Sequence, residues 1–169
     1  MLSEVLSKST CAECRFCCSF RRCSLWETPL FLPEVVENYE GEDRRFCIEE
    51  KDGYAFGRME LTHKYQTACE QEEAACSFLD PQKGCVLSDE EKPFDCKIWP
   101  LRIMNKEGKL FIALTPTCPS INKYPIEKME ALVRGGLDKK IFDYAKEHPY
   151  IVKEYKEGFP ILSSPLEET

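Results

Sequence analysis

Four cysteines stand close together near the start of the chain, and no other feature constrains the fold as strongly. Cys11, Cys14, Cys17 and Cys18 form the pattern C-x2-C-x2-C-C. Gaps of two residues let neighbouring thiolates turn toward one point while backbone amides donate hydrogen bonds to the sulfurs. Tetrahedral zinc and four-iron clusters both take four thiolates, so the pattern predicts a metal site and leaves the metal open.

The adjacent pair Cys17-Cys18 favours more than one metal atom. Consecutive Cα atoms lie only about 3.8 Å apart, and two neighbouring side chains seldom reach one ion together. Two ions or one multinuclear cluster therefore fit the pair better. Bacterial ferredoxins have a similar C-x2-C-x2-C run with a further cysteine that precedes a proline. Cys118-Pro119 offers such a cysteine, which favours an iron-sulfur cluster over zinc.

A second group of cysteines lies in the middle of the chain. It comprises Cys76, Cys85 and Cys96, and with Cys118 and the first run it completes eight predicted metal ligands. Cys23 and Cys69 are interpreted as spare or exchangeable ligands, and Cys47, in a strand-like alternation, as ordinary packing. The two histidines, His63 and His148, stand apart from these motifs and are predicted to be surface or hydrogen-bonded residues.

Composition supports metal-bound thiols over a disulfide scaffold. Eleven of 169 residues are cysteine, below the roughly 8–10% that marks a short secreted disulfide domain. The odd count argues against a closed set of disulfides, and a reducing cytosol keeps thiols reduced unless a metal holds them. The N-terminus has no signal-like apolar segment, and the longest aliphatic or aromatic run, Leu110–Leu114, is too short to span a bilayer. We therefore expect a cytoplasmic protein without a membrane partner.

The net charge narrows the choice of partners. The chain carries a formal charge of −7 with a pI near 5.1. Nucleic-acid affinity comes mostly from basic side chains that release counterions, so no nucleic-acid partner is expected. Five basic residues near the cysteines are candidates for offsetting the negative charge of thiolates: Arg15, Arg21, Arg22, Lys97 and Arg102.

The hydrophobic patterns predict a small α+β single domain over residues 1–160, with its core motif at 11–118, a helical segment at 120–157 and a flexible tail at 161–169. The cysteines are expected on loops that a metal organises. The individual elements are a short helix at Pro33–Tyr39, a hairpin around Asp52-Gly53, a second hairpin from Leu101 to Leu114 with its turn at Asn105 to Gly108, and an amphipathic helix from Ile126 to Ala145, split at Gly135-Gly136 and ended before Pro149.

On these residues the sequence resembles the bacterial and archaeal cysteine-cluster proteins described as zinc- or iron-chelating domains, a family that includes a flagellin lysine N-methylase. The resemblance covers roughly Cys11 to Cys118 and implies bound zinc or iron on the matched cysteines. It rests on the opening run, on the loop that ends in Gly84-Cys85, and on Lys92-Pro93-Phe94-Asp95-Cys96 followed by Trp99-Pro100. Arg15, Lys92 and Lys97 replace the family's usual glycine and two arginines, which places the chain in a divergent branch with its thiolates intact.

The leading hypothesis is a metal-binding cysteine-cluster protein, with iron-sulfur ahead of zinc, in electron transfer or in an accessory metal or redox role. The alternative is a structural zinc module whose helix at Ile126 to Ala145 contacts a protein partner. A component of protein lysine N-methylation is a remote third, because no glycine-rich strand-turn-helix segment offers a site for S-adenosylmethionine. No catalytic triad, phosphate loop or carboxylate pair is recognisable, so whether the chain is an enzyme stays open.

Overall fold

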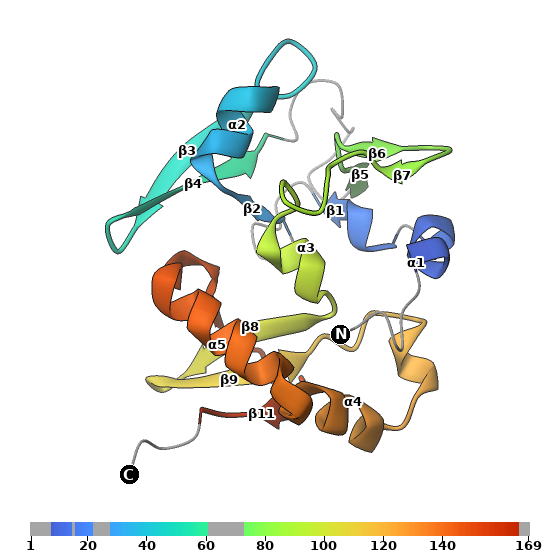
Figure 1. Ribbon diagram of the computed structural model, residues 1–169, viewed down its shortest axis with the longest axis vertical. Coiled ribbons are helices and arrows are strands. Elements are labelled where there is room, and N and C mark those ends of the chain that lie inside the picture. The colour runs from blue at the N-terminus through green and yellow to red at the C-terminus, as the bar shows by residue number, and fades with distance from the viewer. Residues whose placement is uncertain (1–7, 15, 22–27, 61–72, 166–169) are drawn as a thin grey trace. The chain divides into compact units, whose positions relative to one another are not determined.

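A computed structural model describes residues 8–14, 16–21, 28–60 and 73–165 of the chain. The described residues confirm the predicted α+β class, with short helices and four small sheets (Figure 1). Their contacts group into two compact units. We call Lys8–Lys97 the N-terminal unit and 98–165 the C-terminal unit.

The N-terminal unit contains all the predicted ligands except Cys118. Its helices are α1 (Lys8–Cys14), the 3-10 helix η2 (Phe16–Cys18), α2 (Pro33–Tyr39) and α3 (Phe94–Ile98), which ends at the boundary of the unit. Its strands are β1 (Ser19–Arg21), β2 (Leu30–Phe31), β3 (Phe46–Lys51), β4 (Tyr54–Met59), β5 (Glu73–Ala75), β6 (Leu79–Asp80) and β7 (Gly84–Cys85).

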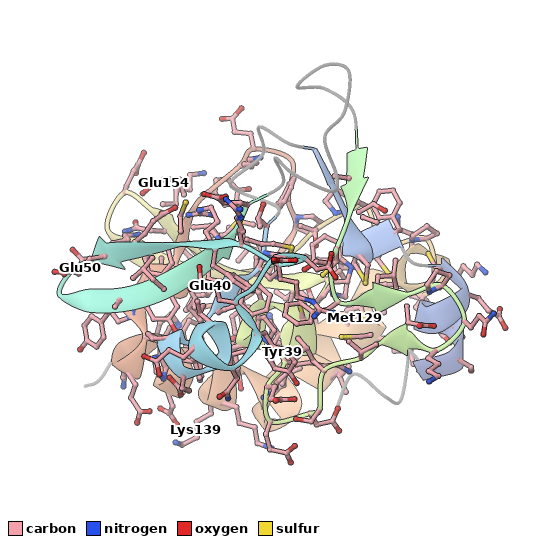
Figure 2. All side chains as sticks on the ribbon, turned by 90° about the horizontal axis from the view of Figure 1, so that it is seen from above. Tyr39, Glu40, Glu50, Met129, Lys139 and Glu154 are labelled. Carbon is pink, nitrogen blue, oxygen red and sulfur yellow. The ribbon has the colours of Figure 1, made fainter. Side chains whose placement is uncertain are left out.

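The first predicted hairpin is confirmed as β3 and β4, which pair antiparallel with Lys51 opposite Tyr54. Asp52 and Gly53 form its two-residue turn at φ 55° and 80°. A turn with positive φ at both central residues matches the right-handed twist of the strands, and aspartate followed by glycine adopts it readily. Figure 2 shows the exposed side chain of Glu50 at the outer end of this hairpin.

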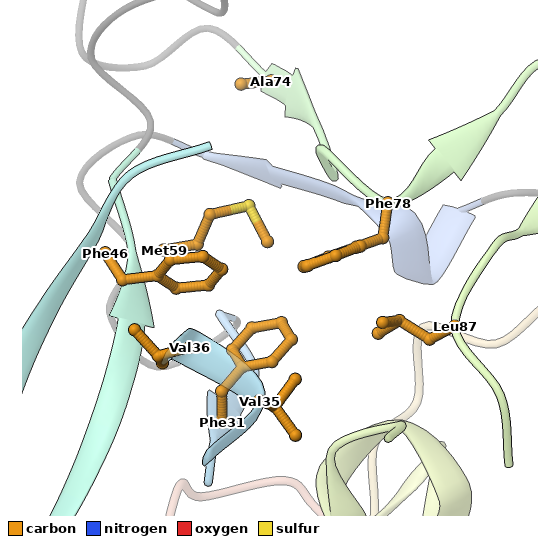
Figure 3. Close-up of a cluster of buried hydrophobic side chains, with 8 residues drawn as sticks. All are labelled: Phe31, Val35, Val36, Phe46, Met59, Ala74, Phe78 and Leu87. Carbon is orange, nitrogen blue, oxygen red and sulfur yellow. The ribbon is translucent and has the colours of Figure 1, made fainter. Parts of the chain in front are cut away.

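The predicted helix at Pro33–Tyr39 is confirmed as α2, with the proline in its first turn. Val35 and Val36 are buried on its inner face. They belong to a core whose other members are Phe31, Phe46, Met59, Ala74, Phe78 and Leu87 (Figure 3). This core draws side chains from α2, from the sheet β2-β4-β3 and from the segment around the second cysteine group, so it ties that segment to the hairpin.

The C-terminal unit is built on one sheet with strand order β10-β8-β9-β11. Its elements are β8 (Leu101–Lys106), β9 (Lys109–Leu114), η3 (Ile121–Lys123), α4 (Ile126–Leu132), the π-helical η4 (Val133–Leu137), α5 (Asp138–Glu147), η5 (Pro149–Ile151), β10 (Lys153–Glu154) and β11 (Ile161–Ser163). The predicted hairpin is confirmed as β8 and β9, but its strands are longer and its turn is only Glu107-Gly108.

The predicted amphipathic helix is confirmed as the continuous run from α4 through η4 to α5, which packs on β8 and β11. Met129, Val133, Ile141 and Ala145 form its buried stripe. The expected split occurs at Gly136, whose φ of 111° is outside helical geometry. The helix ends at Glu147, before Pro149, as predicted.

The structure differs from two other predictions, for the cysteines and for the C-terminal tail. The cysteines were expected on loops, but Cys14 ends α1, Cys17 and Cys18 lie in η2, and Cys96 lies in α3. These helices are only three to seven residues long, too short for a periodic pattern to indicate them. At the start of the segment predicted as a tail, Ile161–Ser163 forms β11 beside β9, and the Leu162 side chain is buried.

No helix in the described parts of the chain has the length and apolarity that a membrane crossing requires.

Packing at Gly57 generates a stability prediction. A Cβ at this position of β4 would collide with a Val36 methyl group of α2. We expect Gly57→Ala to lower the free energy of unfolding by about 1–3 kcal/mol, the usual effect of overpacking a core. Urea unfolding followed by circular dichroism measures it.

Gly135→Ala is the matched control, because a Cβ there meets nothing within 4 Å. Alanine is favoured over glycine by roughly 0.5–1 kcal/mol inside a helix. We therefore expect the control to unfold at equal or higher urea. Equal stability of both variants and the parent chain would contradict the packing at Gly57.

Candidate metal centre

A backbone pairing brings cysteines from the two sequence groups together. β1 runs antiparallel to β5 with Ser19 opposite Ala75, and one further backbone hydrogen bond continues the contact to Cys18, at the end of η2, and Cys76. The Cys76 amide donates to the Cys18 carbonyl over 2.7 Å. The pairing therefore holds two predicted ligands, far apart in sequence, side by side.

Cys76 begins a tight turn that directs one backbone amide toward its sulfur. The Leu79 amide donates to the Cys76 carbonyl over 3.0 Å, which closes the turn. Inside it, the Phe78 amide donates to Cys76 Sγ. A hydrogen bond of this kind favours the thiolate form of a cysteine. The turn thus has the local geometry expected around a metal-bound thiolate.

A second tight turn presents Cys85. β6 and β7 form a two-residue ladder in which Leu79 lies opposite Cys85. Their connection is held by the Asp80 carboxylate, which accepts hydrogen bonds from the amides of Gln82 and Lys83, both at 2.7 Å. Gly84 follows at φ 81°, a conformation that glycine adopts without strain. Cys85 is therefore held at the end of a rigid hairpin, next to the Cys76 turn.

The thiol of Cys18 is polarised toward the thiolate. A hydrogen bond from the Cys17 thiol lowers the pKa of Cys18 from 9.0 to about 7. Burial raises this pKa, and the Lys92 ammonium lowers it further.

Lys92 follows a loop held by a capping box. There the Ser88 hydroxyl accepts from the Glu91 amide over 3.3 Å, and the Glu91 carboxylate accepts from the Ser88 amide over 3.1 Å.

The thiol of Cys76 has the opposite character. Burial raises its pKa from 9.0 to about 12, and negative charge on Cys18 and Cys85 adds to this increase. The Phe78 amide and the Arg44 guanidinium lower it in part. Because charge on Cys18 and Cys85 affects the pKa of Cys76, these three sulfurs lie near enough to one another to interact electrostatically.

Among the described residues, Lys92 lowers the pKa of Cys18 and Arg44 lowers that of Cys76, and neither belongs to the five basic residues expected to offset thiolate charge. Lys92 does lie in the Lys92-Pro93-Phe94-Asp95-Cys96 segment of the resemblance, whereas no motif indicated Arg44. Of the predicted cations, Lys97 is exposed, and Arg102 lies over the Trp99 ring in the C-terminal unit, 4.7 Å from its centroid. Arg15, Arg22 and the Arg21 side chain are outside the described residues.

The remaining predicted ligands lie in several places. Cys14 and Cys96 are exposed thiols of the N-terminal unit, and Cys118 is a buried thiol of the C-terminal unit. The Cys11 side chain, Cys23, Cys69 and His63 lie outside the described residues. Cys47 lies in β3 as predicted, yet it is exposed, and its thiol donates to Glu60 Oε1 over 3.0 Å. His148 stacks on Tyr144 with ring centroids 4.2 Å apart.

The donor set fits a soft metal, although the ligand shell is not closed. Within the described ranges, no three Cys, His, Asp or Glu side chains are arranged to hold a metal ion. The cysteines whose side chains the structure describes are thiols and not disulfides. Thiolates select zinc and iron-sulfur clusters over hard cations. Cys18, Cys76 and Cys85 interact electrostatically and the Cys17 thiol donates to Cys18, so their chemistry suits such a metal although the described geometry does not bring three of them into a ligand set.

No protein-family model, curated protein or solved structure gives a significant match to this chain. The resemblance to the cysteine-cluster family therefore stays a prediction from the motifs.

The two pKa shifts predict different alkylation profiles in the metal-free, reduced protein. The rate at Cys18 should rise with pH up to about 7 and then level, because its thiolate is then fully formed. The rate at Cys76 should keep rising to about pH 12, since burial holds it as a thiol. Iodoacetamide labelling with residue-resolved mass spectrometry measures both profiles.

Cys47 is the internal reference, because it is exposed and a hydrogen bond to Glu60 raises its pKa. Its profile should level above that of Cys18. A common midpoint near 9 for Cys18 and Cys76 would contradict the electrostatics described above.

Proposed function

We propose that this chain is a metal-binding cysteine-cluster protein. The observation that carries the proposal is the backbone hydrogen bond from Cys76 to Cys18, which extends the contact of β1 with β5 and joins two cysteines that 57 residues separate in the sequence. A single short motif of thiols could serve several chemical roles. Here two motifs meet through a backbone pairing and a third cysteine lies on the adjoining hairpin, and metal binding is the simplest role that uses all three.

Iron-sulfur is favoured over zinc within this proposal. Cys17 and Cys18 are adjacent, and the thiol of one donates to the sulfur of the other. Such a pair suits a multinuclear cluster, whose metal atoms are spread over several ångströms, better than one tetrahedral ion. A bound cluster would supply one-electron chemistry, which fits electron transfer or an accessory redox role in the cytoplasm. The protein's own residues would hold it, offset its charge and limit its contact with water.

The full set of proposed ligands is larger than the group described above. Cys11 and Cys14 complete the C-x2-C-x2-C-C run with Cys17 and Cys18, and they are assigned on the motif. Cys96 and Cys118 are assigned on the sequence alone. A site assembled from segments so distant in sequence couples metal binding to folding, because the unfolded chain cannot form it.

A structural zinc module that binds a protein partner is the second candidate. The start of α4 favours it, since Tyr124 and Ile126 expose large apolar side chains there, each at 38%. In that case the thiolate site holds the fold and the helix provides the contact surface. Participation in protein lysine N-methylation remains the remote third proposal and has no support from the described residues.

Purification separates these candidates. We expect the protein, purified without oxygen and without added metal, to be brown and to contain iron and acid-labile sulfide, measured by elemental analysis and visible absorption. A colourless protein with stoichiometric zinc would instead support the structural module. Absence of both metals from the anaerobic protein would contradict metal binding altogether.

Single substitutions test the ligand assignment. We expect Cys17→Ser and Cys96→Ser to lose most of the bound metal and to melt at lower temperature. Losing a ligand present at about 100 times its Kd removes about 2.7 kcal/mol, which at this chain length lowers Tm by roughly 5–11 °C.

Cys47→Ser is the matched control, because it removes a thiol of the same unit that is not a proposed ligand. It should keep its metal and its Tm. Full metal content and unchanged melting in both ligand variants would refute the assignment.

A further inference from the structure

Arg44 is held in place by its own backbone. It lies in the loop between α2 and β3, where it forms a two-way bridge with Gly41. The Gly41 amide donates to the Arg44 carbonyl over 2.8 Å, and the Arg44 amide donates back over 3.3 Å. The side chain is half-buried.

That side chain contacts both residues that follow Cys76. Arg44 Nε donates to the Ser77 carbonyl over 3.3 Å. The guanidinium carbon lies 4.8 Å from the centroid of the Phe78 ring. Phe78 is 1% exposed and packs its ring against Phe31, with centroids 5.5 Å apart. The arginine therefore holds the Cys76 turn against the core of the N-terminal unit.

Phe78 links this contact to the sulfur. Its ring lies beneath the guanidinium, and its amide donates to Cys76 Sγ. A planar guanidinium combines a stacked face with directional N–H donors, and it keeps its charge at any accessible pH. The position of Arg44 thus combines a fixed positive charge with a bond to the turn that carries the sulfur.

The thiols beside it need such a charge. Cys18 is hydrogen-bonded to Cys76 through the backbone, Cys85 lies on the hairpin that follows, and Arg44 contacts the two residues directly after Cys76. Neighbouring thiolates in a partly buried site repel one another. A metal reduces this repulsion only in part, because four thiolates outweigh one divalent ion.

We propose that Arg44 is a positioning residue of the metal centre, which fixes the Cys76–Phe78 turn and offsets the negative charge of the gathered thiolates, and so raises the affinity for metal. This inference rests on the proposed function, since it assigns a role around the same site. Residues that orient metal ligands without touching the metal typically raise metal affinity 10–100-fold, so we expect Arg44 to raise it about tenfold.

The test is a titration of the reduced, metal-free full chain with Co²⁺ alone at one fixed pH, followed by the thiolate-to-cobalt absorption. Arg44→Gln keeps the length and removes the charge. We expect it to bind Co²⁺ about tenfold more weakly. Arg44→Lys restores the charge and should recover most of the affinity.

Arg58→Gln is the matched control. Arg58 belongs to the same unit, pairs with Glu49 at 2.7 Å and lies over the Phe56 ring, 5.8 Å from its centroid. It faces Cys47, which is not a proposed ligand. The control therefore removes an ion pair and a ring contact from another part of the same unit, and it should leave the cobalt affinity unchanged.

The outcomes separate this inference from the proposed function. Parental cobalt affinity in Arg44→Gln, an equal loss in Arg58→Gln, or a lysine variant no better than glutamine would each overturn the role of Arg44 and leave metal binding intact. A parent chain that binds no cobalt and carries no iron or zinc when purified would overturn both.

Discussion

The antiparallel pairing of β1 with β5 is the interaction on which the candidate site depends. It joins a segment near the start of the chain to one near its middle, and its last hydrogen bond runs from the Cys76 amide to the Cys18 carbonyl over 2.7 Å. Strands of only three residues form a weak ladder on their own. The pairing is therefore supported by the burial of Ala74, in the middle of β5, and by the turn that begins at Cys76. A metal bound to Cys18 and Cys76, which adjoin the two strands, would reinforce the same connection.

Crowding of sulfur is the second constraint, and it explains why cations matter here. Bringing Cys18, Cys76 and Cys85 into one partly buried region disfavours more than one negative charge among them. Cys18 and Cys76 accordingly favour different protonation states. The Cys17 thiol and Lys92 stabilise Cys18 as a thiolate, while burial keeps Cys76 protonated. A metal cation reduces this repulsion, because its positive charge lets neighbouring sulfurs ionise together. Proton release should consequently accompany metal binding.

The core of the N-terminal unit and the candidate site share one residue, Phe78. Its ring packs among Phe31, Phe46 and Tyr39, as Figure 3 shows for the first two, while its amide donates to Cys76 Sγ. Tyr39 in turn donates to Glu91 over 2.9 Å, and that glutamate closes the capping box that precedes Lys92. The positions of Arg44 and Lys92 therefore both depend on the packing of this core. This arrangement makes the position of the sulfurs depend on helix α2 and the β3–β4 hairpin.

The sequence by itself determined the elements with strong local signals. Asp52-Gly53 specified its hairpin because few residue pairs tolerate two positive φ angles, and the stripe from Met129 to Ala145 specified its helix because it must bury one face. The cysteine spacing likewise indicated which thiols to consider. Only the tertiary structure decided which of them meet, and that Arg44 and Lys92 accompany them. Pairing of two three-residue strands leaves no periodic pattern in a sequence, and the direction of a long side chain depends on a fold that no single segment contains.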